Sequence, residues 1–259
     1  MYRVIATDLD GTLLRSDGSI SPRTRAALDR CVSDGVRLII ATGRAKASAA
    51  HVLPPDFHRG IWACCNGADI HEDGVLIAQN GIAPDLAKDI CRRIVSVSPQ
   101  ANVYAVVGGE LYFMRPATIS VPYHVVPDLD SVMDVPVGKI AFHLSDIPDI
   151  EMLRSNLPDD CRFILTVGAQ IGEIMAPTAT KAWAVASVVK RWGLDLSDVI
   201  AFGDETNDIE MLAECGLGVA MKDSHPDLIA VADRIAPSND EDGVAQVLES
   251  LFMEVVKSP

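Results

Sequence analysis

Residues 4–14 read VIATDLDGTLL, and they contain a pattern that recurs along the chain. The apolar run 4–6 has the length and composition of a short buried β-strand. This run stops at Asp8, and Gly11 then allows the chain to turn. Asp8 and Asp10 alternate along the extended segment, so their side chains can share a direction. The stretch therefore predicts a buried strand whose carboxyl end carries a pair of carboxylates.

Apolar runs alternate with helical patterns at both ends of the chain. Ser21 followed by Pro22 is a typical helix start, because the serine hydroxyl caps free N–H groups and proline suits the first helical position. The expected strands are 4–6, 36–41, 61–65, 199–202 and 217–220, and the expected helices are 22–35, 180–192, 207–214, 226–231 and one from about Asp242. Strands that alternate with helices imply right-handed crossovers. We therefore predict an α/β fold with a doubly wound parallel sheet of Rossmann-like type.

The middle of the chain, residues 82–172, lacks this regular alternation. Its expected helices are 84–98 and 148–155, and its expected strands are 102–107, 111–113, 138–144, 162–167 and 170–176. Such a mixture is typical of an α+β unit. We therefore predict a core domain formed by 1–81 and 173–259, into which 82–172 is inserted. We expect the insertion to cover the carboxyl edge of the core sheet, with hinges near Ile82–Pro84 and Gly172–Glu173.

The composition of the chain excludes several classes of partner. The 259 residues include 22 basic and 36 acidic ones, which gives a formal net charge of −14. Nucleic acid and anionic membrane surfaces attract basic proteins, so neither is expected as a partner. Asp8 and Asp10 lie where a signal peptide would carry its apolar run. The six cysteines show no CxxC pair and fit buried thiols in a reducing compartment. We therefore expect a cytoplasmic protein, either monomeric or homodimeric.

Polar side chains gather where the expected parallel strands end, and this is the edge at which open parallel sheets bind ligands. These groups are Asp8 and Asp10, the run 42–44, and Asp204 with Asn207 and Asp208. The spacing of Asp204 and Asp208 would place both on one face of the first turn of a helix. Carboxylates clustered at one edge are costly to bury unless a cation neutralises them. A partial set of carboxylate oxygens suits Mg²⁺, and we therefore predict a Mg²⁺ site there.

The same edge offers groups that can hold an anion. Gly11 and Thr12 turn the chain and supply N–H groups. A carboxylate beside Mg²⁺ indicates phosphoryl transfer through a carboxylate nucleophile. Arg44 and Asn66 lie at strand ends that face the same cleft. For each of these two residues, a substrate contact and a purely structural role fit equally well.

Four motifs, in order along the chain, resemble those of the haloacid dehalogenase-like (HAD) superfamily. They are DLDGTLL at 8–14, TGR at 42–44, Lys181 in EIMAPTATK, and GDETND at 203–208. The insertion between the second and third motifs is similar to the cap of the Cof-type subfamily, subclass IIB. The resemblance covers the whole chain. It implies a Mg²⁺-dependent phosphatase that hydrolyses a small phosphorylated metabolite, such as a sugar phosphate, through an aspartyl-phosphate intermediate.

The resemblance also assigns roles to individual residues. It implies that Asp8 attacks phosphorus and that Asp10 protonates the leaving group and then activates water. Thr42 and Lys181 would hold the phosphoryl oxygens beside these two catalytic residues. The implied metal-binding residues are Asp8, Asp10 through its main-chain carbonyl, Asp204 and Asp208. The phosphate- and substrate-binding set comprises Leu9, Gly11, Thr42, Gly43, Arg44, Asn66, Lys181 and Asn207.

Two alternatives remain open at the level of the sequence. A phosphomutase of the same superfamily would use the same aspartyl phosphate but return the phosphoryl group to a sugar. A non-catalytic phosphometabolite-binding protein would keep the fold and lack turnover. Neither the nucleophile Asp8 nor the acid Asp10 is missing, which favours an enzyme.

Overall fold

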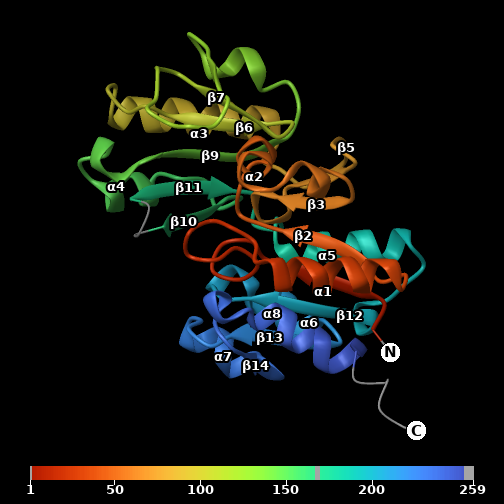
Figure 1. Ribbon diagram of the computed structural model, residues 1–259. Coiled ribbons are helices and arrows are strands. Elements are labelled where there is room, and N and C mark those ends of the chain that lie inside the picture. The colour runs from red at the N-terminus through yellow and green to blue at the C-terminus, as the bar shows by residue number, and fades with distance from the viewer. Residues whose placement is uncertain (1, 167–169, 254–259) are drawn as a thin grey trace, which may run out of the picture.

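Two β-sheets organise the computed structural model, which describes residues 2–166 and 170–253 (Figure 1). The larger sheet has the strand order β14-β13-β12-β1-β2-β3-β4-β5. Its strands are β1 (Val4–Thr7), β2 (Arg37–Ala41), β3 (Ile61–Cys64), β4 (Asp69–Glu72), β5 (Val75–Gln79), β12 (Val199–Gly203), β13 (Leu217–Met221) and β14 (Arg234–Ala236). The pairs from β14 to β3 are parallel, and β4 and β5 add an antiparallel hairpin. The predicted parallel sheet is therefore confirmed, and the hairpin extends it.

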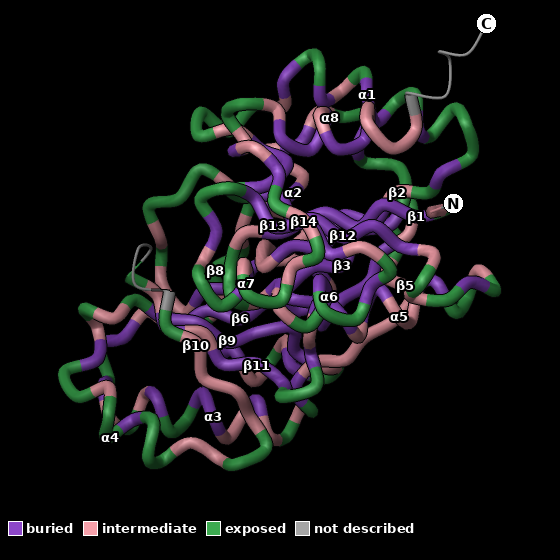
Figure 2. Tube along the Cα trace, turned by 90° about the horizontal axis from the view of Figure 1, so that it is seen from below, coloured by how far each residue is buried: buried purple, intermediate pink, exposed green. Residues whose placement is uncertain are grey.

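Helices cover both faces of the larger sheet, as a doubly wound fold requires. One face packs against α1 (Pro22–Ser33), α2 (Lys46–Val52) and α8 (Gly243–Leu248). The other face packs against α5 (Lys181–Arg191), α6 (Ile209–Glu214) and α7 (Pro226–Val231). Figure 2 shows the central strands buried and the outward sides of the helices exposed. The core is therefore a three-layer sandwich.

Two local sequence signals fix helix starts that matter for the site. The Ser21 hydroxyl accepts a hydrogen bond from the N–H of Thr24 at 3.0 Å, so α1 begins as predicted. The Thr180 hydroxyl accepts one from the N–H of Trp183 at 3.1 Å. Because Thr180 caps α5, Lys181 becomes the first residue of that helix.

The smaller sheet has the strand order β10-β11-β9-β6-β7-β8. Its strands are β6 (Tyr104–Val107), β7 (Glu110–Phe113), β8 (His124–Val125), β9 (Val137–His143), β10 (Arg162–Thr166) and β11 (Ile171–Met175). Helices α3 (Pro84–Val97) and α4 (Ile150–Ser155) belong to the same unit, and the strands β9 and β11 lie between α3 and the larger sheet (Figure 2). Residue 167, expected to end a strand, lies outside the described residues.

The expected hinge at Gly172–Glu173 lies inside β11 rather than in a connecting segment. Gly172 serves packing there, because a Cβ at this position would lie 2.6 Å from the ring of Phe142. The two connections between the sheets run side by side at Asn80 and Thr178. The Asn80 amide donates to the Thr178 carbonyl at 2.7 Å, and the Thr178 hydroxyl donates back to Asn80 at 2.9 Å. The return to the core therefore follows Met175.

Five further elements differ from the sequence-based expectation. The strand expected to reach residue 65 ends at Cys64, because Cys65 has a positive φ of 49°. The helix expected from residue 207 begins at Ile209, after a short 3₁₀ turn. Helix α2 and the β4–β5 hairpin were not expected at all. None of the helices in the described part of the chain is long and apolar enough to cross a membrane.

Candidate active site

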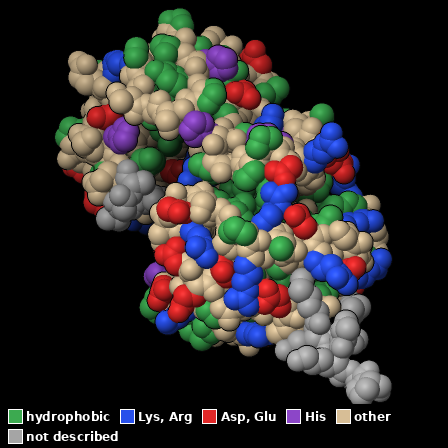
Figure 3. Space-filling view, in the orientation of Figure 1, with side chains coloured by type: hydrophobic (Ala, Val, Ile, Leu, Met, Phe, Trp, Pro, Cys, Tyr) green, Lys and Arg blue, Asp and Glu red, His purple; other side chains and the backbone are tan. Residues whose placement is uncertain are grey.

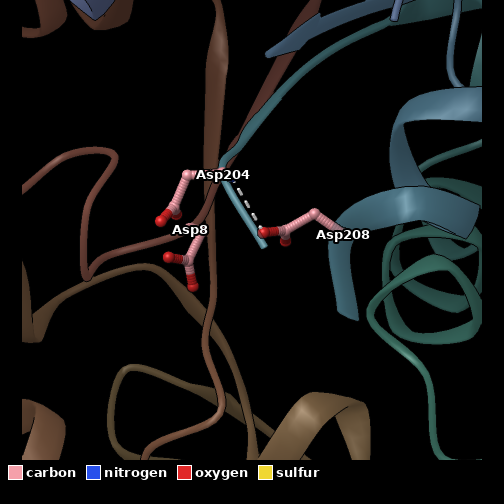
Figure 4. Close-up of side chains that lie close together, drawn as sticks. All are labelled: Asp8, Asp204 and Asp208. Carbon is pink, nitrogen blue, oxygen red and sulfur yellow. Dashed lines mark hydrogen bonds between the residues drawn. The ribbon is translucent and has the colours of Figure 1, made fainter. Parts of the chain in front are cut away.

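Three carboxylates meet at the carboxyl ends of the central strands. Asp8 follows β1, Asp204 follows β12, and Asp208 lies just before α6. One carboxylate oxygen from each lies within 4.8 Å of the others. In Figure 4, Asp208 reaches back toward Asp8 and Asp204 from the opposite side of the site. Residues from the two ends of the chain therefore form one acidic cluster.

Lys181 is the cation built into this cluster. Its ammonium group donates to Asp8 Oδ1 at 2.6 Å and to Asp208 Oδ1 at 2.7 Å. The lysine side chain is only 1% exposed. Burial alone would lower the pKa of Lys181, but the carboxylates of Asp208 and Asp8 raise it above its ordinary value. Lys181 therefore stays charged and holds Asp8 in a fixed position.

One ammonium group does not balance three carboxylates. Burial raises the pKa of Asp8 to about 8, with the negative charges of Asp208 and Asp204 adding to the effect of burial. Burial likewise raises the pKa of Asp204 to about 6. Lys181 lowers the pKa of both aspartates, but its single charge does not offset burial and the neighbouring carboxylates. Three converging carboxylates with a single ammonium partner keep an excess of negative charge. Their oxygens are a suitable donor set for a divalent cation such as Mg²⁺.

The turn between Asp204 and Asp208 brings these two side chains together. Asp208 Oδ2 accepts hydrogen bonds from the N–H groups of Asp204 and Glu205, both at 3.2 Å. The dashed line in Figure 4 marks the first of these bonds. The expectation that both aspartates share the first turn of a helix is therefore wrong, because a 3₁₀ turn precedes α6. Their carboxylates converge through capping of this turn.

Gly11 and Thr12 secure Asp204 from the other side. Gly11 has a φ of +77°, and a Cβ built on it would overlap Asp204 Oδ2. Only glycine fits both this conformation and this close approach. The Thr12 hydroxyl donates to Asp204 Oδ1 at 2.8 Å. The turn after β1 therefore holds a carboxylate that comes from the far end of the sequence.

Asp10 is not one of the three clustered carboxylates and pairs with Arg44 instead. The Arg44 guanidinium donates through Nε and Nη2 to the two oxygens of Asp10, both at 2.7 Å. The Asp10 side chain is 53% exposed, so it is open to the solvent. Such a bidentate pair fixes the plane of both groups. The structure thus joins Asp10 and Arg44, two residues that the sequence analysis placed in different roles.

Thr42 and Gly43 form the loop that follows β2. Thr42 is fully buried, and its hydroxyl accepts a hydrogen bond from the N–H of Arg44 at 3.1 Å. Its main-chain carbonyl accepts from the N–H of Asn66 at 2.9 Å. The Thr42 hydroxyl proton is therefore left for another acceptor. This is the arrangement needed to donate to a bound anion.

Asn66 and Asn207 connect this loop to the acidic cluster. The Asn207 amide donates to Asn66 Oδ1 at 2.8 Å, and a Cβ on Gly43 would lie 3.2 Å from that same oxygen. Asn207 Oδ1 is buried with no hydrogen-bond partner among the described residues. Asn66 adopts a φ of +52°, which asparagine tolerates better than most residues. Leu9 differs from the rest of the expected set, because its side chain is buried in the hydrophobic core.

The smaller sheet contributes contacts that the sequence analysis did not anticipate. The Lys139 ammonium, from β9, donates to the Gly43 carbonyl at 3.0 Å. Met175, at the end of β11, accepts a weak hydrogen bond from the Asn66 amide at 3.5 Å. The sequence feature that could have indicated a role for Lys139 is its position as the single lysine in the strand VGKIAFH. Burial of that lysine requires a partner, but the sequence does not show which one.

Comparisons with known proteins match nearly the whole chain. Residues 5–248 match the family model described as haloacid dehalogenase-like hydrolase. A 5-amino-6-(5-phospho-D-ribitylamino)uracil phosphatase of Bacillus subtilis is 29% identical, over 96% of this chain and 97% of its own length. An Escherichia coli protein of the same name is 25% identical, over 96% of each chain. The solved structure of the HAD subclass IIB sugar phosphatase BT4131 aligns with a TM-score of 0.76 at 20% identity, covering 96% of this chain and 98% of that one.

Proposed function

Because the chain belongs to the haloacid dehalogenase-like hydrolase family, we propose that its acidic cluster is the catalytic centre of a Mg²⁺-dependent phosphatase. The enzyme is a phosphatase of this family that acts on small phosphorylated molecules. The observation that carries the proposed chemistry is the convergence of Asp8, Asp204 and Asp208 around the buried Lys181.

Asp8 is the proposed nucleophile. Lys181 holds Asp8 Oδ1 at 2.6 Å, so the carboxylate cannot rotate freely when phosphorus approaches. Attack by a fixed carboxylate forms an aspartyl phosphate and spares the reaction the cost of orienting the nucleophile. Asp10 is the proposed acid for the leaving oxygen and the later base for water. Its exposed position two residues beyond Asp8 supports this role.

Mg²⁺ is the proposed cofactor, held by Asp8, Asp204, Asp208 and the main-chain carbonyl of Asp10. When bound, it would neutralise charge on the phosphoryl oxygens and on the carboxylates around them. Thr42 is the proposed hydroxyl donor to those oxygens, and the N–H groups of the turn at Gly11 are proposed to add to it. The raised pKa of Asp8 supports the need for this additional positive charge.

The smaller sheet with its helices, residues 82–175, is the proposed cap over the site. The contacts of Lys139 and Met175 with the loops of the core support this role. Figure 3 shows Lys and Arg side chains interspersed with Asp and Glu over the core. Neither positive nor negative charge therefore dominates the visible face. With a net charge of −14, attraction of an anionic substrate must be local. Lys181, Arg44 and the metal ion are the proposed local charges.

Two of the relatives are named for one substrate, 5-amino-6-(5-phospho-D-ribitylamino)uracil. We therefore place this compound first among the candidate substrates, ahead of simple sugar phosphates. A phosphate-release screen with Mg²⁺ that includes both classes, run beside Asp8→Asn, tests the proposal. We expect one substrate to be hydrolysed well and the variant to release no phosphate above background. Equal release by Asp8→Asn, or none from any substrate with the intact chain, would reject the proposed function.

A further inference from the structure

Lys139 links the cap to the loop that carries Thr42. Its ammonium donates to the Gly43 carbonyl at 3.0 Å and pairs with Glu173 of the neighbouring strand β11. The lysine side chain is 10% exposed and that of Glu173 is 13% exposed. The two side chains therefore form a nearly buried ion pair, and one of its members touches the core.

The bond to Gly43 differs from the other hydrogen bonds of this loop. The carbonyl groups of Thr42 and Arg44 accept from the N–H groups of Asn66 and Cys65, which belong to the core. Within the described part of the chain, Gly43 is the one residue of this loop whose carbonyl accepts a hydrogen bond from the cap. The core thus fixes the peptides on either side, and the cap fixes the one between them.

The peptide held by Lys139 acts directly on Thr42. The Gly43 carbonyl and the Arg44 N–H belong to the same planar unit, so the orientation of one sets that of the other. The Arg44 N–H donates to Thr42 Oγ1 at 3.1 Å. This bond occupies a lone pair of the hydroxyl oxygen and thereby limits where its proton can point. A continuous path leads from the Lys139 ammonium to the Thr42 hydroxyl.

We propose that Lys139 is a positioning residue that couples closure of the cap to the orientation of the Thr42 hydroxyl. When the cap closes, the Lys139 ammonium fixes the Gly43–Arg44 peptide, and the peptide N–H directs the hydroxyl proton toward a phosphoryl oxygen. When the cap opens, this constraint is lost. Catalytic competence is thereby confined to the closed state, in which bulk water is excluded. The inference rests on the proposed phosphatase activity.

The charge state of Lys139 suits this role. Burial alone would lower its pKa, but the Glu173 carboxylate raises it above the ordinary value of a lysine. The ammonium therefore remains a full donor when the cap is closed. Chains of hydrogen bonds that begin at a charged donor strengthen one another in a buried setting.

The matched variants are Glu173→Gln and the double variant Lys139→Met with Glu173→Gln. The single variant removes the ion pair but keeps the donor to Gly43. The double variant removes the donor without leaving an unpaired buried carboxylate. With p-nitrophenyl phosphate and Mg²⁺, we expect the double variant to lose kcat by about 10- to 100-fold relative to the single variant, the range of one charge-assisted hydrogen bond. We expect KM to change by less than about threefold, because Lys139 acts on the orientation of Thr42 and not on ground-state binding.

Hydrogen–deuterium exchange supplies a second readout that needs no turnover. Fragments containing the Arg44 amide should exchange faster in the double variant than in Glu173→Gln, while those of strand β6 in the cap stay protected in both. Equal kcat values for the two variants, or equal exchange at Arg44, would overturn the inference. If the intact chain hydrolyses nothing, the proposed function fails first, and the exchange at Arg44 still decides whether Lys139 controls this loop.

Discussion

At the scale of single residues, the site depends on the buried ammonium group of Lys181. The carboxylates of Asp8 and Asp208 each accept a hydrogen bond from this ammonium group, at 2.6 and 2.7 Å. Removing one partner of a buried ion pair leaves an uncompensated charge, which costs far more than the pair itself contributes. Lys181 is therefore both a proposed ligand of the phosphoryl group and a structural requirement.

Lys181→Met should lower the free energy of unfolding by about 3–5 kcal/mol at pH 7 without metal, because two buried carboxylates lose their partner. Urea denaturation measures this change. Lys190→Met is the matched control, since Lys190 lies on the same helix and is exposed. The control should shift the free energy by less than about 0.5 kcal/mol. Similar losses for both variants would contradict the role assigned to Lys181.

Gly11 and Gly18 have the same backbone conformation, so alanine variants at these positions distinguish backbone strain from a steric clash. Gly11 has φ +77° and Gly18 has φ +79°, but only a Cβ on Gly11 would overlap Asp204. Both alanine variants should lose about 1–2 kcal/mol of stability from the left-handed backbone. Gly11→Ala should also lose Mg²⁺ binding, because Asp204 must move. Isothermal titration with Mg²⁺ distinguishes the two, and tight binding by Gly11→Ala would count against the proposed metal site.

At the scale of secondary-structure elements, the sequence predicted those segments that its local pattern determines. Helix α1 follows from Ser21 and Pro22, and the first strand follows from its apolar run. The β4–β5 hairpin escaped prediction because β4 carries Asp69 and His71, two polar residues that are nevertheless buried. Cys65 escaped because its left-handed conformation follows from contacts in the folded protein and not from its own preference. Local propensity cannot report such tertiary effects.

Asp69 in strand β4 should make the stability of the protein depend on pH. Burial raises the pKa of Asp69 to about 6, and its Oδ2 has no hydrogen-bond partner among the described residues. The folded state therefore binds this proton more tightly than the unfolded state does. The contribution of Asp69 to stability should fall as pH rises from about 4 to about 6 and then stay lower by about 3 kcal/mol.

Asp69→Asn should remove this loss, since an amide keeps the contact with Gln79 and does not ionise. Urea denaturation at pH 4.5 and pH 7.5 measures the difference between the intact chain and the variant. The variant should be the more stable protein at pH 7.5. Parallel pH dependence of the two proteins would show that Asp69 ionises normally in the folded state.

At the scale of the whole molecule, the chain folds into two sheets, and residues of the smaller sheet contact the loops at the edge of the larger sheet where the site lies. Parallel strands end together, and this predicted Asp8, Thr42 and Asp204 at one edge of the sheet. Lys181, which begins helix α5, was assigned to the site through the family resemblance alone. The sequence could not show the contact between Lys139 and Gly43, since it joins strand β9 to the loop after β2 across 96 positions. The pairing of Asp10 with Arg44 was also missed, because strand topology places both residues at one edge without showing which side chains pair there. Motifs thus reveal the residues of the core site, whereas packing decides which parts of the insertion reach it.

The central claim, that the Asp8 carboxylate itself takes the phosphoryl group, is tested most directly by trapping the covalent intermediate. Rapid acid quenching during turnover with Mg²⁺, followed by borohydride reduction, converts an aspartyl phosphate to homoserine. Mass spectrometry of the peptide spanning residues 4–15 then locates the change. We predict homoserine at position 8 in a substrate-dependent amount and none in a sample without Mg²⁺. Turnover with position 8 unmodified, or with the modification at another residue, would contradict the account.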